Sequence, residues 1–202
     1  MAAPRNHIKV FIASTVYNFH NELNSIYALL DGLGYDVYMS HKGSLPLDSK
    51  VSNLENCTNG VEGCDVFVGF IRPDYGSGVF KKGDKSITHQ EFETAYKKDI
   101  PRFVLADYRV SFTRDLFRKN KVIKNNSNEK LKFEDISFKD NKVMDTRCVE
   151  MYNEAIKDKE RPASKRKGNW VQSYIELPDI MLHIDAQFKE PERIKKLINN
   201  SN

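Results

Sequence analysis

Several features that define common protein classes are absent from this sequence or rare in it. Three cysteines, an odd number with no C-x-x-C pair, argue against a disulfide scaffold or a zinc site and favour a reducing cytoplasm. No apolar run approaches the roughly 20 residues that span a bilayer, and the first residues show no signal-peptide core, so we expect a cytoplasmic protein without a membrane partner. The five histidines have no metal-ligand spacing, so we predict no metal.

Two further motifs are present only in part, and the charge is unevenly distributed. Gly76 and Gly78 form a G-x-G, but the rest of a dinucleotide fingerprint and a Walker lysine are missing. The net charge is +4, and the excess lies in residues 111–202. The basic cluster at 157–167 contains acidic residues and Pro162 and has no aromatic residues between its charges. It is more typical of a solvated loop than of a nucleic-acid interface, so we do not expect nucleic acid as a partner.

The first half of the chain alternates predicted strands with predicted helices. Runs rich in β-branched and aromatic residues predict four strands, at 7–13, 35–39, 65–71 and 102–106. Apolar residues at steps of three and four predict helices between them, from just after Thr15 to about 33, at 52–62, and from Ser86 to before Pro101. The order βαβαβαβ requires parallel pairing with right-handed crossovers. We therefore predict an α/β fold with a flavodoxin-like, doubly wound parallel sheet.

The pattern weakens in the second half. Helices are predicted at 112–117, 143–156, 177–188 and 192–198, with an irregular insertion at 119–142. The one tryptophan, Trp170, is interpreted as a packing anchor. We predict an α/β domain of residues 1–108 and a mostly helical extension of residues 109–202, packed on or beside it.

A polar loop between the third strand and the third helix is the expected functional site. Residues 72–85 hold the turn-forming residues and most of the local charge, directly after a strand that is apolar along its length. Ligands of open α/β sheets bind at the carboxyl ends of the strands. Any active site is therefore expected in this loop and at the start of the helix that follows.

Several motifs, in a fixed order along the chain, resemble a widespread TIR-like domain family. Residues 11–15 read F-I-A-S-T and match the family's F-I-S-S-T opening, with Ala13 in place of a serine. The family's acid-Asn-Cys motif corresponds to residues 55–57. Its C-D-x-F-V, Y-G-S and S-I-T-x-x-E motifs correspond to residues 64–68, 75–77 and 86–91. The resemblance covers about the first 108 residues.

The resemblance implies an activity. Members of the family are commonly the amino-terminal part of larger NACHT or repeat proteins in immune-type systems. The family is similar in turn to TIR domains and to nucleoside deoxyribosyltransferases, in which a Glu acts at the ribose carbon that bears the base; the matching residue is Glu91. This implies a TIR-like enzyme of bacterial antiviral defence that hydrolyses or cyclises NAD as its substrate, with no cofactor. It further implies a homo-oligomer when active, with an effector protein or a signal receptor as partner.

Elementary chemistry supports the same residue. Cleavage of an N-glycosidic bond develops positive charge on the sugar, which a carboxylate stabilises or attacks. Nicotinamide leaves NAD as a neutral base, whereas a purine needs a proton from an acid. Glu93 points to another face of the helix than Glu91, and the loop shows no second carboxylate aimed with it. A single carboxylate favours NAD over nucleosides.

Polar residues near Glu91 supply groups that suit a nucleotide. Hydroxyls and helix-start N–H groups at Ser14 and Thr15 suit phosphate or ribose, and Arg72 suits a pyrophosphate. Tyr75 is expected to stack on a base and His89 to position a ribose hydroxyl. The complete predicted substrate-binding set is Ser14, Thr15, Arg72, Tyr75, Ser77, Thr88 and His89.

Each of these features also has a purely structural interpretation. Thr88-x-x-Glu91 is a capping box, Ser14-Thr15 a plain N-cap, and the charges of the loop a solvated surface. Three functions therefore stay open. NAD cleavage leads; a nucleoside or nucleotide deoxyribosyltransferase or N-glycosidase is the second; a non-catalytic module that senses a nucleotide or self-assembles is the third.

Overall fold

A parallel sheet forms the centre of the computed structural model, which describes residues 7–79, 81, 83–119, 143–156 and 170–201. Within these residues the strand order is β2-β1-β3-β4-β5, and every neighbouring pair is parallel. The strands are β1 (Lys9–Ala13), β2 (Asp36–Tyr38), β3 (Val66–Ile71), β4 (Arg102–Asp107) and β5 (Val171–Tyr174). The predicted α/β, flavodoxin-like sheet is confirmed.

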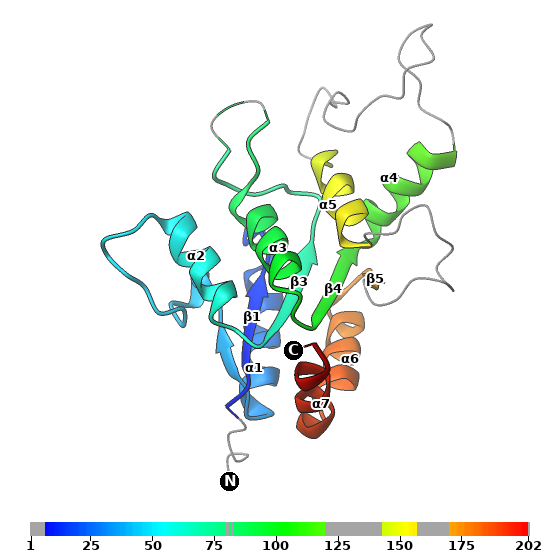
Figure 1. Ribbon diagram of the computed structural model, residues 1–202. Coiled ribbons are helices and arrows are strands. Elements are labelled where there is room, and N and C mark those ends of the chain that lie inside the picture. Colours follow the sequence, from blue (N-terminus) through cyan, green and yellow to red (C-terminus); the bar gives the residue numbers. More distant parts are fainter. Residues whose placement is uncertain (1–6, 80, 82, 120–142, 157–169, 202) are drawn as a thin grey trace, which may run out of the picture.

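Helices cover both faces of the sheet (Figure 1). One face carries α1 (His20–Gly32), α6 (Leu177–Phe188) and α7 (Pro191–Ser201). The other face carries α2 (Asn53–Glu62), α3 (Ile87–Lys98), α4 (Tyr108–Lys119) and α5 (Arg147–Ala155), and a 3₁₀ turn, η1 (Ser40–Lys42), follows β2. Alternate residues of β1 enter the two cores, Val10 and Ile12 on the α1 side and Phe11 and Ala13 on the α3 side.

The second half of the chain contains a strand that the sequence did not predict. Val171–Tyr174 pairs with β4 and extends the sheet, although V-Q-S-Y carries little apolar pattern. Trp170, just before it, is 65% exposed, so the prediction of a packing anchor was wrong. Helix α6 has the predicted bounds, and α4 begins four residues before the predicted start at 112. The predicted insertion at 119–142, beyond its first residue, and the basic cluster up to 167 lie outside the described residues.

A glycine in β3 sets how closely α3 approaches the sheet. A Cβ atom at Gly69 would lie 2.3 Å from Cζ of Phe92 and 2.7 Å from Cε1 of Phe67. The ring of Phe92 therefore occupies the space that a side chain at Gly69 would need. The close approach of α3 to β3 at Phe92 therefore sets the position of the helix that carries Glu91.

Tyr35 links α6 to the α1 side of the sheet, which gives a simple test of that core. Its hydroxyl donates a 2.7 Å hydrogen bond to the carbonyl oxygen of Phe188, and both side chains are fully buried. We expect Tyr35→Phe to lower the free energy of unfolding by about 1–2 kcal/mol, because a buried carbonyl loses its partner. Urea denaturation measures the change; an unaltered midpoint would contradict this packing.

Candidate functional site

A cavity opens at the carboxyl edge of the sheet, where the strand order reverses. The chain leaves β1 toward β2 on one side and returns to β3 on the other, so the crevice between β1 and β3 is the topological switch point. The cavity has a volume of about 410 Å³ and is lined by Ser14, Thr15, Val16, Tyr17, Ser40, Asn53, Cys57, Asp74, Gly76, Ser77, Ile87, Thr88 and Glu91. These residues come from the segments after β1, β2 and β3 and from the amino-terminal halves of α2 and α3. The predicted site loop and helix start thus meet at one cavity.

Glu91 reaches this cavity from the second turn of α3. The helix begins at Ile87, and its N-cap is Ser86, whose hydroxyl accepts a 3.2 Å hydrogen bond from the backbone N–H of His89. The interpretation of Thr88 and Glu91 as a capping box was therefore wrong, because the cap lies two residues earlier. The side chain of Glu91 is 4% exposed, and its carboxyl group does not cap the amino-terminus of the helix.

The surroundings of Glu91 alter its acidity. Burial raises its pKa to about 8, while a hydrogen bond with the thiol of Cys57 acts in the opposite direction. The same burial, with the nearby Glu91 adding to it, raises the pKa of Cys57 to about 12. At neutral pH Glu91 is therefore protonated in the cavity wall and lies beside a neutral thiol. A carboxyl group with this pKa gives up its proton readily when a cation lies beside it.

A second carboxylate lines the same cavity. Asp74, at the start of the loop after β3, forms a 3.5 Å ion pair with the buried guanidinium group of Arg72. The loop was expected to offer no second carboxylate aimed with Glu91; the structure brings Asp74 into the wall of the same cavity, with its carboxylate paired with Arg72. No local sequence pattern marks Asp74 as part of the cavity wall, because that place depends on how the segments after β1, β2 and β3 meet. Two carboxyl groups in unlike surroundings are the usual basis of paired acid and base roles.

Four of the predicted substrate-binding residues line the cavity, namely Ser14, Thr15, Ser77 and Thr88. The hydroxyl of Thr15 is buried and has no hydrogen-bond partner within the described part of the protein. Helix α1 begins only at His20, with Phe19 as its N-cap. Ser14 and Thr15 therefore neither cap the helix nor lie at its first N–H groups, and what they offer a ligand is hydroxyl and loop-backbone groups.

The other three predicted substrate-binding residues are used within the protein. Arg72 donates hydrogen bonds to the carbonyl oxygens of Thr15 and Tyr17, and its guanidinium group lies 4.5 Å from the ring centre of Phe19. Tyr75 and His89 are buried and hydrogen-bonded to each other at 2.6 Å. Arg72, Tyr75 and His89 are not among the described residues that line the cavity. Their contacts are instead suited to holding the loops around the cavity in position.

Residues 55–57 have divided roles. Asn56 holds the loop before α2, because its side chain accepts from the N–H of Asp48 and donates to the carbonyl oxygen of the same residue. Cys57 instead faces Glu91 in the cavity. The burial of Cys57 and Cys64 is confirmed.

Gly76 lies close to Thr15 across the cavity wall, and a substitution at Gly76 tests this close approach. Its φ is +94°, and a Cβ atom there would lie 2.6 Å from Cγ2 of Thr15. Gly83 has a similar φ of +96° with open space around it, so Gly83→Ala is a matched control for backbone strain alone. We expect Gly76→Ala to cost about 1–2 kcal/mol more unfolding free energy than Gly83→Ala. If urea denaturation shows equal losses of unfolding free energy for the two variants, Thr15 does not pack against Gly76.

The described residues hold no helix long and apolar enough to cross a bilayer. Nor do they hold a group of three or more His, Cys, Asp or Glu side chains that would suit a metal ion. The fold and the cavity define an α/β protein with a doubly wound parallel sheet and a buried carboxyl group at its switch point.

Residues 9–184 match the family described as a domain of unknown function, DUF4062, and the chain belongs to this family. The match covers all five described strands and ends within α6. Neither curated proteins nor solved structures gave a match.

Proposed function

We propose that this protein is a TIR-like enzyme that cleaves the N-glycosidic bond between nicotinamide and ribose in NAD, with Glu91 as the catalytic carboxylate. The observation that carries the proposal is the burial of Glu91 in the cavity wall at the sheet's switch point, with its pKa raised to about 8. The hydroxyl groups around it suit the ribose. The motifs shared with the TIR-like family support the same assignment.

The proposed chemistry follows from the charge of the substrate. The nicotinamide group of NAD is cationic, so its entry beside Glu91 favours loss of the carboxyl proton. The ionised carboxylate then stabilises or attacks the sugar carbon as the bond to nicotinamide breaks and the base leaves neutral. Attack by water yields ADP-ribose, nicotinamide and a proton; attack by another atom of the same molecule yields a cyclic product. The setting we propose is bacterial antiviral defence, with a homo-oligomer as the active form and an effector or receptor as partner.

A nucleoside N-glycosidase or deoxyribosyltransferase is the second candidate, and Asp74 favours it. A purine leaving group needs a proton, which Glu91 holds at neutral pH, while Asp74 supplies a carboxylate in the same cavity. In this case Glu91 is the general acid, and Asp74 takes the part of the ionised carboxylate that Glu91 has in NAD cleavage.

Incubation of the purified protein at high concentration with NAD and common nucleosides, followed by mass analysis, tests the proposal. Loss of NAD with release of nicotinamide is the expected result, and the mass of the second product separates hydrolysis from cyclisation. Release of bases from nucleosides with NAD intact would instead support the second candidate. If no substrate is consumed and NAD only raises the melting temperature saturably, the protein is a nucleotide-binding module.

The pH profile separates the two chemistries. If NAD cleavage requires ionised Glu91, kcat/KM for NAD rises tenfold per pH unit below about pH 8 and levels off above it, since kcat/KM reports the free enzyme. The plateau of kcat begins at lower pH because the bound cation favours the ionised form. A kcat/KM that falls above pH 8 would mean that Glu91 acts as an acid.

A further inference from the structure

A hydrogen-bonded chain of three side chains lies behind the cavity wall and joins α5 to the loop after β3. The hydroxyl of Tyr75 lies 2.6 Å from Nδ1 of His89, and Nε2 of His89 lies 2.7 Å from Oε2 of Glu154. Tyr75 and His89 are almost fully buried. Tyr75 sits between Asp74 and Gly76, both of which line the cavity. The chain thus runs from α5 to the cavity wall.

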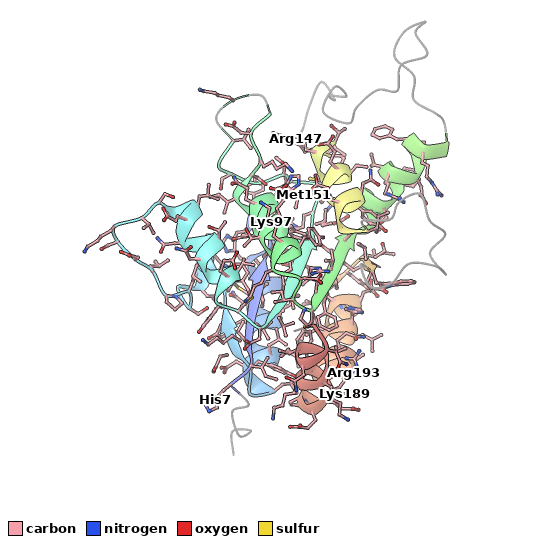
Figure 2. The ribbon with its side chains drawn as sticks, in the orientation of Figure 1. His7, Lys97, Arg147, Met151, Lys189 and Arg193 are labelled. Atoms are coloured by element: carbon pink, nitrogen blue, oxygen red, sulfur yellow. The ribbon has the colours of Figure 1, made fainter. Side chains whose placement is uncertain are left out.

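Other contacts from α5 and the residues before it hold the same loop. The N–H of Asp145 donates a 2.8 Å hydrogen bond to the carbonyl oxygen of Pro73, and the thiol of Cys148 lies 3.5 Å from the same oxygen. The guanidinium group of Arg147 lies 4.1 Å from the ring centre of Tyr75 and is itself paired with Asp145 at 2.6 Å. Figure 2 labels Arg147 at the end of α5 that lies at the carboxyl edge of the sheet.

Glu154, at the α5 end of this hydrogen-bonded series, is also held by an ion pair. Lys85 lies 3.3 Å from Glu154 and 2.6 Å from Glu93, so one ammonium group joins α5 to α3 beside the His89 contact. Besides the contact between Tyr75 and His89, the loop is joined to α3 by the 2.9 Å hydrogen bond from the N–H of Ile87 to the carbonyl oxygen of Ser77. Tyr75 therefore lies between an anchored segment on α5 and the part of the wall that would contact a ligand.

We infer that Tyr75, His89 and Glu154 are positioning residues. They anchor the loop after β3 to α5 and so hold its cavity-lining residues Asp74, Gly76 and Ser77 in place for the substrate. The inference deepens the proposed function, since the substrate concerned is NAD. It also gives residues 145–156 a part in the site although none of them lines the cavity. From the sequence, Tyr75 was expected to stack on a base and His89 to position a ribose hydroxyl. Because both side chains are buried behind the cavity wall, we assign contact with the substrate to the lining residues that they hold in place.

Tyr75→Phe tests the inference, with Tyr35→Phe as a matched control. Both changes remove one buried tyrosine hydroxyl with a hydrogen bond of nearly equal length, 2.6 Å and 2.7 Å, on opposite faces of the sheet. We expect Tyr75→Phe to raise KM for NAD by about tenfold with kcat changed less than about twofold. Tyr35→Phe should leave both constants unchanged. Glu154→Gln should raise KM in the same direction.

Hydrogen exchange on the ligand-free protein tests the same inference without activity. The amide of Ile87 is protected by its bond to Ser77, so Tyr75→Phe should speed its exchange about tenfold while Tyr35→Phe should not. Equal exchange of Ile87 in the two variants would overturn the inference. If the wild-type protein leaves NAD intact, the proposed function fails, and the exchange result alone decides the role of Tyr75.

Discussion

Replacing Glu91 by Gln is expected to lower the rate of NAD cleavage by about a thousandfold or more, because the amide can neither carry the negative charge that stabilises the cationic sugar nor attack it. Gln has nearly the same volume as Glu and keeps a polar group beside Cys57, so the packing against the sheet is preserved. Nicotinamide release at saturating NAD measures the effect. The wild-type protein and the variant should give the same circular dichroism spectrum.

Glu93→Gln is the matched control for this prediction. Glu93 lies two residues further along the same helix and pairs with Lys85 at 2.6 Å outside the cavity. The same chemical change there should alter NAD cleavage by less than about threefold. Full activity in Glu91→Gln, or an equal loss in both variants, would show that the cavity carboxyl group is not the reacting one.

Glu91→Gln is also expected to stabilise the fold in a pH-dependent way, and this second effect needs no substrate. The pKa of Glu91 rises from 4.5 to about 8 on folding. Between these pH values the unfolded chain has lost the proton while the folded protein keeps it, so the free energy of unfolding of the wild type falls as pH rises. Gln has no proton to lose, so the free energy of unfolding of Glu91→Gln should not show this fall. The difference in unfolding free energy between the variant and the wild type should therefore grow by on the order of 4 kcal/mol between pH 4.5 and 8.

Urea denaturation of both proteins at pH 5 and pH 8 measures this difference. Other titrating groups contribute equally to both proteins and cancel. A difference that stays constant across this range would show that Glu91 is hydrated and ionised in the folded state. The two predictions for Glu91 are independent. If Glu91→Gln stabilises the fold as expected but the wild-type protein does not cleave NAD, the result would point to the binding-module alternative.

Much of the fold was predictable because periodicity and turn residues are local. Apolar runs such as that of β3 and steps of three and four such as those in α1 showed strands alternating with helices, and this order was sufficient to predict a doubly wound parallel sheet. The strand β5 was not predictable, since V-Q-S-Y forms a strand only because the free edge of β4 offers backbone partners. Trp170 misled for a related reason: tryptophan is usually buried, but here it precedes an edge strand and faces solvent.

The candidate site was predictable only in part. The sequence selected the loop of residues 72–85 because a polar loop follows a buried strand, and it selected Glu91 because that residue matches the Glu of the families that the motifs resemble. It misplaced the cap of α3, because Ser86 and Thr88 are equally good caps in sequence and only the course of the loop selects Ser86. It also missed Asp74 and Cys57 as neighbours of Glu91 in the cavity, because contacts between separate loops and helices leave no periodic signal.

The sequence by itself determined the parallel α/β architecture, the edge of the sheet at which the cavity opens and the presence of Glu91 in the helix that follows the site loop. Tertiary structure alone decided which polar side chains share the cavity with Glu91 and which are used behind it. Arg72, Tyr75 and His89 carry groups that suit a nucleotide equally well in the sequence, but packing buries them against the backbone of β1's loop and against α5. Burial also sets the acidity of Glu91, since the pKa of a carboxyl group depends on the solvent and charges around it and not on its neighbours in the chain.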